Sequence, residues 1–171
     1  DQACRELNLL ALVLRAGLLR GDFELYFQQQ DHPLFGSVIG FELLLHWRHR
    51  TRGLVPPMEF IPIADRNGFI NELGEWVLRE ACMEAATWKN PVRIAVNVAA
   101  PQLADMTLPA KVRDILAYSG LPADRLELEI TEAGIIADQQ RALIIIRLLK
   151  DIGVKIAMDD YGTGYSSLST L

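Results

Sequence analysis

The chain has 171 residues, of which 50% are hydrophobic and 23% are charged, and its 17 basic and 22 acidic side chains give a formal net charge of −5. This length fits one domain with a substantial apolar core, and the composition excludes disordered and fibrous proteins. The acidic balance argues against a DNA- or RNA-binding protein that neutralises phosphates. The apolar stretches are interrupted by Arg15 and Arg147 and are shorter than the ~20 residues that cross a bilayer, so we expect no membrane insertion and no signal peptide.

The two cysteines, Cys4 and Cys82, have no CxxC partner and no nearby histidine. Zinc and redox motifs are therefore unsupported, and a reducing, cytoplasmic location is expected. The first residue is Asp1 rather than Met. We therefore expect the sequence to be part of a longer polypeptide.

The first half of the chain predicts a helix, a hairpin and two further helices. Good helix formers fill residues 3–20 and stop at Gly21. Residues 23–28 and 38–46 are strand-like runs separated by turn residues, which predicts an antiparallel pair. After Pro56 and Pro57, helical spacing predicts helices over 58–66 and 71–88.

The second half alternates strands with helices. Strands are predicted over 92–98, 126–131 and 154–159, and helices over 108–119 and 139–151. This alternation is typical of parallel βαβ units. No interior linker divides the chain, so residues 1–171 are expected to form one domain.

The three predicted parallel strands carry polar residues at every second position, although buried parallel strands are usually apolar throughout. Near the strand starts these residues are Arg93, Glu127 and Lys155. Opposite charges of this kind can neutralise one another inside a barrel or curved sheet. We therefore expect a buried structural layer of charges.

A second polar layer, at or near the strand ends, has no basic member. It consists of Asn97, Glu129 and Asp159. Converging acids need protons or a metal ion to coexist, and oxygen ligands suit Mg²⁺, Mn²⁺ or Ca²⁺. The carboxyl ends of strands are also where (β/α) barrels place their active sites. The alternative is that these acids are solvated or cap neighbouring helices.

Several ordered segments together are similar to the EAL-domain phosphodiesterases, which act on the bacterial second messenger cyclic di-GMP. The naming motif is similar to residues 40–47, Gly-Phe-Glu-Leu-Leu-Leu-His-Trp. The other matching segments are residues 59–64, 73–78, 95–98, 127–132 and 159–168. The resemblance covers essentially the whole chain.

The resemblance implies a site with two Mg²⁺ or Mn²⁺ ions, for which Ca²⁺ would be a substitute or an inhibitor. The implied metal ligands are Glu42, Asn97, Glu129, Asp159 and Asp160. Glu132 is implied to order the loop after Asp159, and Gln28, Leu45 and His46 to contact cyclic di-GMP, with Glu42 and Asp159 also at the ligand. The alternative for Glu42 alone is a surface glutamate on an edge strand. The implied product is linear pGpG.

The sequence also departs from the family pattern. His46 replaces an arginine that reaches a ligand phosphate, and a histidine cannot supply the same bidentate contact. Gln29 and Ala99 replace a proline and a serine. Family members continue with three further β/α units that carry a catalytic lysine, a glutamate and a glutamine. Residues 1–171 are therefore expected to be an EAL domain without its C-terminal units, and to hydrolyse cyclic di-GMP poorly.

The expected fold is α/β, an incomplete TIM-like (β/α) barrel with an early antiparallel strand, truncated after about five strands. An open sheet edge of this kind favours a homodimer. The alternative functions are a degenerate EAL domain that binds cyclic di-GMP without cleaving it, and a barrel that serves only for partner contact. The parent protein is expected to carry GGDEF, PAS or receiver domains.

Overall fold

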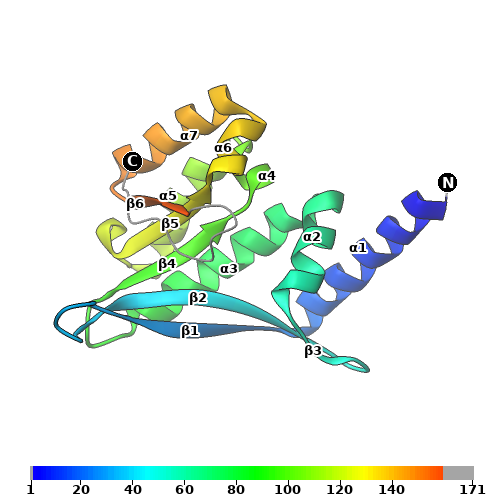
Figure 1. Ribbon diagram of the computed structural model, residues 1–171, viewed down its shortest axis with the longest axis horizontal. Helices are drawn as coiled ribbons and strands as arrows, with labels where there is room; N and C mark the ends of the chain where they lie inside the picture. The colour runs from blue at the N-terminus through cyan, green and yellow to red at the C-terminus, as the bar shows by residue number, and fades with distance from the viewer. Residues whose placement is uncertain (1, 160–171) are drawn as a thin grey trace.

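A computed structural model describes residues 2–159 of the protein (Figure 1). Its first half begins with a helix that extends away from the sheet, followed by a long hairpin. The elements are α1 (Gln2–Arg20), β1 (Phe23–Asp31), β2 (Val38–His49), β3 (Gly53–Val55), α2 (Pro57–Asn67) and α3 (Phe69–Ala86). The predicted helices and strands of this half are confirmed, and the short strand β3 is additional.

The second half alternates strands and helices as predicted. Its elements are β4 (Arg93–Val98), α4 (Ala100–Leu103), α5 (Leu108–Ser119), the 3-10 turn η1 (Ala123–Arg125), β5 (Leu126–Thr131), α6 (Glu132–Ala137), α7 (Gln139–Ile152) and β6 (Lys155–Asp159). The sequence did not predict α4, η1 or α6. Each is too short for a hydrophobic period to emerge.

The strands form one mixed sheet in the order β1-β2-β4-β5-β6, with β3 paired to the far end of β2. β1 and β2 are antiparallel, whereas the pairs β2–β4, β4–β5 and β5–β6 are parallel. This arrangement confirms an α/β fold whose first strand pair is antiparallel.

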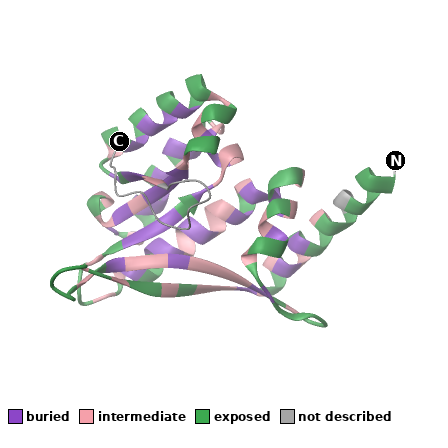
Figure 2. Ribbon diagram, in the orientation of Figure 1, coloured by how far each residue is buried: buried purple, intermediate pink, exposed green. Residues whose placement is uncertain are grey.

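The main core lies between the sheet and the helices α2, α3, α5 and α7. Alternate residues of β4 and β5 are buried there, including Ile94 and Leu128, and Ile156 of β6 is buried with them; the buried segments of the strands are seen in Figure 2. α3, α5 and α7 add their own buried aliphatic side chains from one face of each helix. Burial of one face leaves the alternate strand residues on the other face free for chemistry.

Aromatic contacts fix the hairpin to this core. The ring of Phe23 stacks on that of Trp47 at a centroid distance of 5.8 Å, and Phe60 from α2 packs edge-on against Phe23 at 5.6 Å. At the other end of the hairpin, Trp88 contacts Phe27 and Phe41 at 5.2 and 5.1 Å. Both ends of β2 are therefore held against the helical layer.

The predicted charge layer is present as a row but is not buried. Arg93 and Glu127 form an ion pair at 3.3 Å, with side-chain exposures of 44% and 17%. Lys155 is the cross-strand neighbour of Glu127 and is exposed. The prediction of a buried network was wrong because, in the part of the chain that the structure describes, the sheet is not closed around these side chains. An exposed pair of this kind contributes at most about 1 kcal/mol.

Within residues 2–159, no helix combines the length and the apolar character needed to cross a membrane.

Candidate functional site

Four of the predicted site residues, Glu42, His46, Asn97 and Glu129, lie on the face of the sheet that points away from the helices. On β2, Leu43 and Trp47 are buried in the core, so the alternate residues Glu42 and His46 lie on the opposite face. On β4 and β5 the same alternation places Asn97 and Glu129 on that face, because Val96, Val98, Leu128 and Ile130 pack into the core. Strand alternation thus puts these four residues on one face of the sheet.

The ladder register defines their spacing. Asn97 and Glu129 are direct cross-strand partners, and neighbouring strands lie about 4.8 Å apart. Glu42 is paired with Ala95, two residues before Asn97. Asp159 is paired with Thr131, two residues after Glu129. Asn97 and Glu129 are therefore level with each other in the ladder. Glu42 lies two residues nearer the strand starts, and Asp159 lies two residues nearer the strand ends.

Glu42, Asn97 and Glu129 differ in their exposure. Glu129 is only 3% exposed, although it is ionisable. Glu42 is half-buried, and Asn97 is exposed. Burial of a carboxylate at the centre of such a row is costly unless a cation or hydrogen bonds compensate. Glu129 is thus the focus of the candidate site.

The donor set fits a hard divalent cation. It offers the carboxylates of Glu42 and Glu129 and the amide of Asn97, and oxygen ligands of this type bind Mg²⁺, Mn²⁺ and Ca²⁺. Within residues 2–159, no three His, Cys, Asp or Glu side chains already form a cluster that could hold a metal. In a flat sheet β2 and β6 would lie about 14 Å apart, which is three strand spacings in total. The sheet must therefore curve before residues on β2 and β6 can bind the same ions.

The remaining predicted residues occupy three different surroundings. Gln28 is exposed and lies directly opposite Glu42 in the β1–β2 ladder. Glu132 is exposed in the first turn of α6. Asp159 is the last residue of β6, and Asp160 lies outside the described residues.

His46 lies in a polar cluster at the end of the β1–β2 hairpin. Its ring packs against Tyr26 at a centroid distance of 4.3 Å, and its buried Nδ1 has no hydrogen-bond partner within the described part of the chain. Tyr26 donates to Glu24 at 2.8 Å, and Arg48 donates to both Glu24 oxygens at 2.8 and 3.1 Å. Hydrogen bonds from Arg48 and Tyr26 lower the pKa of Glu24 to about 2.

A cavity of about 350 Å³ adjoins Asn97 where β2 and β4 separate. The two strands pair only from Gly40 to Glu42 on β2, so a gap opens beyond Glu42. Leu44, Leu45 and Asn97 line this cavity, and α2 and α3 supply further apolar walls. Leu45 points to the helical side of β2, away from Glu42 and His46, yet it lines this cavity.

Two lining residues were missed by sequence reasoning. Thr131 and Gln102 contribute the other polar groups of the cavity. Thr131 ends β5 and accepts a hydrogen bond from the Gly134 amide at 3.0 Å. The Thr-Glu pair at 131–132, where the predicted strand ends, was a capping signal that could have identified α6.

Comparisons with known proteins identify the family of the chain. Residues 12–171 match the EAL domain family. The chain is 50% identical over its whole length to an uncharacterised signalling protein of Caulobacter vibrioides, of which it covers 21%. It is 40% identical over 159 residues, 91% of this chain, to the bifunctional diguanylate cyclase/cyclic di-GMP phosphodiesterase MucR of Pseudomonas aeruginosa, and covers 23% of that protein.

A solved structure supports the same relationship. The PaMucR phosphodiesterase in complex with c-di-GMP superposes with a TM-score of 0.84 at 39% identity, over 93% of this chain and 66% of that one. The chain thus spans about a fifth of the length of these curated relatives. With a family match over residues 12–171, the chain belongs to the EAL-domain family of cyclic di-GMP phosphodiesterases.

Proposed function

We propose that this chain is part of a metal-dependent phosphodiesterase that binds cyclic di-GMP and hydrolyses it to linear pGpG. The observation that carries this proposal is the row of Glu42, Asn97, Glu129 and Asp159 positions across four parallel-paired strands. The MucR phosphodiesterase, solved with c-di-GMP, supports the ligand assignment. We further propose that residues 1–171 belong to a single EAL domain.

The stagger of the row supports a curved, barrel-like sheet. Strands in a (β/α) barrel are tilted, so residues at one height along the barrel axis step along successive strands. The rise from Glu42 to Asn97 and from Glu129 to Asp159 follows this rule. We propose that the sheet is the first part of a TIM-like barrel, with the four residues at one level of its mouth.

The proposal assigns metal binding to five residues. Glu42, Asn97, Glu129, Asp159 and Asp160 would hold Mg²⁺ or Mn²⁺. When bound, such ions polarise a phosphoryl oxygen, activate water and stabilise the leaving oxygen. Without cations, the carboxylates would repel an anionic phosphodiester.

The ligand itself would contact both sides of the metal row. The cavity of about 350 Å³ beside Asn97 has the size of a small-molecule site and mostly apolar walls, so we propose that it seats one guanine base. Gln28 lies opposite Glu42, where it can donate to the other half of the ligand. Glu132, in the first turn of α6, would order the loop after Asp159.

A second candidate function is a receptor that binds cyclic di-GMP without cleaving it. The observation that favours it is His46, which is packed against Tyr26 where the family has a phosphate-binding arginine. An imidazole offers one donor in place of a guanidinium fork. Weak positioning of the phosphate would lower the turnover rate more than it would lower the affinity for the guanine bases.

Calorimetry with Mn²⁺ tests the metal site. The protein should bind Mn²⁺, and Glu129→Gln should weaken that binding by about tenfold or more, because a carboxylate at the centre of the row loses its charge. Glu127→Gln is the matched control, since Glu127 lies on the same strand and face but outside the row. Equal effects of the two substitutions would contradict the site.

A pGpG-release assay separates the two functions. Turnover with Mn²⁺ that Glu129→Gln abolishes supports the phosphodiesterase. Binding of cyclic di-GMP without turnover supports the receptor. His46→Arg should then tighten cyclic di-GMP binding by about tenfold, equivalent to ~1.4 kcal/mol, because it restores the bidentate contact.

We also propose that the chain operates within a larger signalling protein. The relative MucR is described as a bifunctional cyclase and phosphodiesterase, and the chain covers 23% of it. A GGDEF-type cyclase domain is therefore the first candidate for a neighbouring domain.

A further inference from the structure

We infer that Gln102 is a positioning residue that fixes the end of strand β4 on which Asn97 lies. The absence of a side chain at Gly74 leaves the space that the Gln102 side chain occupies. The inference rests on the proposed metal role of Asn97. Gln102 is not one of the proposed metal ligands, although it lines the cavity that we propose for a guanine base.

Asn97 depends on its backbone for its position. Its side chain is exposed. β4 ends one residue later, at Val98, and the chain then turns into α4. The β4–β5 ladder holds one side of the Asn97 backbone, so the turn after Val98 is the other restraint on this end of the strand.

The side chain of Gln102 holds the turn. Its Oε1 accepts a hydrogen bond from the backbone N–H of Ala99 at 2.9 Å. Gln102 is the third residue of α4, so this bond closes the first turn of the helix on its own N-cap residue. Gln102 is 5% exposed, and with Glu129 it is one of two buried polar or charged residues in the described part of the chain.

Gly74 makes this arrangement possible. A Cβ atom at position 74 would collide with the amide group of Gln102. Gly74 lies inside α3, where glycine costs roughly 1 kcal/mol relative to alanine. A glycine in that position is explained by the close approach of the Gln102 amide.

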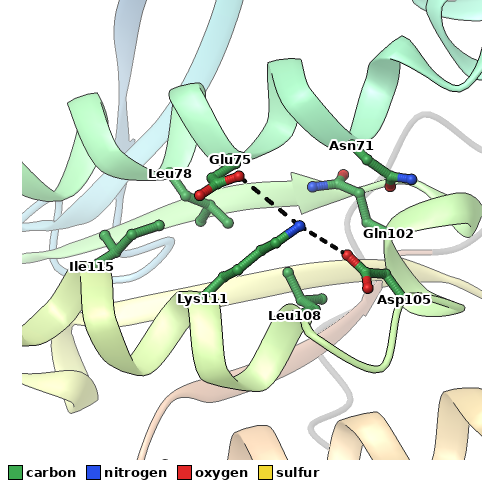
Figure 3. A pocket seen from close by; sticks show the side chains of 8 residues that line it. All are labelled: Asn71, Glu75, Leu78, Gln102, Asp105, Leu108, Lys111 and Ile115. Carbon is green, nitrogen blue, oxygen red and sulfur yellow. Dashed lines mark hydrogen bonds and ion pairs between the residues drawn. The ribbon is translucent and has the colours of Figure 1, made fainter.

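Gln102 also separates two cavities. It lines the cavity of about 350 Å³ beside Asn97 and, on its other side, a cavity of about 10 Å³. Figure 3 shows the smaller cavity between α3 and α5, with Lys111 bonded to Asp105 at 3.0 Å and paired with Glu75 at 3.9 Å. This volume is that of one water molecule.

The smaller cavity explains how the far side of Gln102 is supported. Asn71 also lines it, and the buried Oδ1 of Asn71 has no hydrogen-bond partner in the described part of the chain. A single water there would satisfy Asn71 and pack against Gln102. Gln102 packs against Gly74 of α3 on one side and accepts a hydrogen bond from the β4–α4 turn on the other.

The first test compares Gln102→Ala with the conservative Gln102→Glu. Gln102→Ala removes the acceptor of the Ala99 N–H and should weaken Mn²⁺ binding by about tenfold, as loss of an outer-shell group does. Gln102→Glu keeps an oxygen acceptor and should retain most of the affinity. Ile115→Ala is the matched control, because Ile115 lines the same small cavity and is 6% exposed but lies on α5.

The comparison separates positioning from a purely structural role. Ile115→Ala should lower the melting temperature without changing Mn²⁺ affinity, whereas Gln102→Ala should change both. If the two variants lower the melting temperature and leave Mn²⁺ affinity unaltered, the inference is overturned.

The second test is a double-mutant cycle with Gly74→Ala. In the unaltered protein Gly74→Ala should reduce Mn²⁺ affinity and stability, because the new methyl group displaces Gln102. In the Gln102→Ala background the same change should be neutral or stabilising, since the collision is gone. Equal costs in both backgrounds would contradict the pairing.

Amide hydrogen exchange tests the positioning role of Gln102 independently of the proposed metal site. Failure of the unaltered protein to bind Mn²⁺ would overturn the proposed metal site. The positioning role would still be judged by exchange at Val98 and Ala99, which Gln102→Ala should accelerate and Gln102→Glu should not. Unchanged exchange at both amides would overturn it.

Discussion

Gly40 shows how one residue controls the placement of the candidate site. A Cβ atom at this position would lie 2.7 Å from the backbone oxygen of Arg93, closer than side chains tolerate. Gly40 opens the three-residue ladder that joins β2 to β4 and ends at Glu42. The absence of a side chain at Gly40 therefore permits the contact that brings Glu42 beside β4.

We expect Gly40→Ala to destabilise the protein by about 1 to 3 kcal/mol, the usual cost of overpacking. The clash is with backbone, which cannot rotate away as a side chain can. Chemical denaturation measures the free energy of unfolding. An unchanged denaturation midpoint would show that the β2–β4 contact is looser than described.

Glu24 provides a pH-dependent prediction. Its pKa is lowered to about 2 from 4.5, first by the hydrogen bond from Arg48 and then by that from Tyr26. Because the folded pKa is depressed, the stabilisation from this carboxylate is complete above pH 4.5 and is lost as the pH falls towards 2. NMR titration should show Arg48→Gln raising the Glu24 pKa towards 4.5, and Tyr26→Phe raising it less. A Glu24 pKa near 4.5 in the unaltered protein would contradict the cluster.

The site residues differed in how far they could be predicted from the sequence. Asn97, Glu129 and Asp159 were predicted from strand alternation alone, because polar residues break the apolar pattern of buried strands. Glu42 was identified only by family resemblance, since a glutamate on a hairpin strand carries no signal of its own. Gln102 was missed, because its role depends on Gly74, which is 28 positions away in sequence (102 minus 74).

At the scale of elements, Arg125 joins three segments. Its Nε donates to the carbonyl of Val92 at 3.1 Å, and its Nη2 donates to the carbonyl of Ala85 at 3.0 Å. It therefore ties the turn before β5 to the end of α3 and the start of β4. These two hydrogen bonds help to set the relative positions of β4 and β5, the strands that carry Asn97 and Glu129.

Arg125→Met should destabilise the protein by about 1 to 3 kcal/mol, because two partly buried carbonyls lose their donor. Arg125→Lys should recover only part of this loss, since an ammonium lacks the planar fork. Thermal and chemical unfolding check both variants. Arg113→Met is the control: Arg113 is 66% exposed and pairs only at 3.5 Å with its neighbour Asp114, so it should change stability by less than about 0.5 kcal/mol.

Long elements were predictable and short ones were not. The helix predicted over 108–119 and the strand over 126–131 have the same bounds in the structure. α4 and α6 have four and six residues, and they are held by side-chain hydrogen bonds and tertiary packing, with no hydrophobic period of their own. These two short helices follow Asn97 and Glu129, so the least predictable elements lie nearest the site.

At the scale of the whole molecule, the direction in which polar side chains face was predictable, but their burial was not. Strand alternation assigns Arg93, Glu127 and Lys155 to one face. Their burial depends on whether the sheet closes, which is a property of all strands together. In the described part of the chain Arg93 stays 44% exposed, so Lys155→Met should alter stability by less than about 1 kcal/mol, in place of the larger loss expected for a buried network.

The last prediction concerns self-association through the β6 side of the molecule. Within residues 2–159, β6 is paired along one edge only, with β5. The adjoining helix α7 exposes Leu143 at 51%, Ile144 at 50% and Leu148 at 41%. An unpaired strand edge beside exposed aliphatic side chains favours association with another surface.

We therefore expect light scattering to detect a dimer or larger species of the 171-residue chain, with a mass that rises with protein concentration. The double substitution Leu143→Lys with Ile144→Lys should shift the population towards monomer, because it places charge on the exposed face of α7. Met58→Lys is the matched control: Met58 is 88% exposed but lies on α2, away from β6, and the same change there should leave the mass unaltered. A chain that stays monomeric at every concentration would show that the β6 edge is protected within the protein itself.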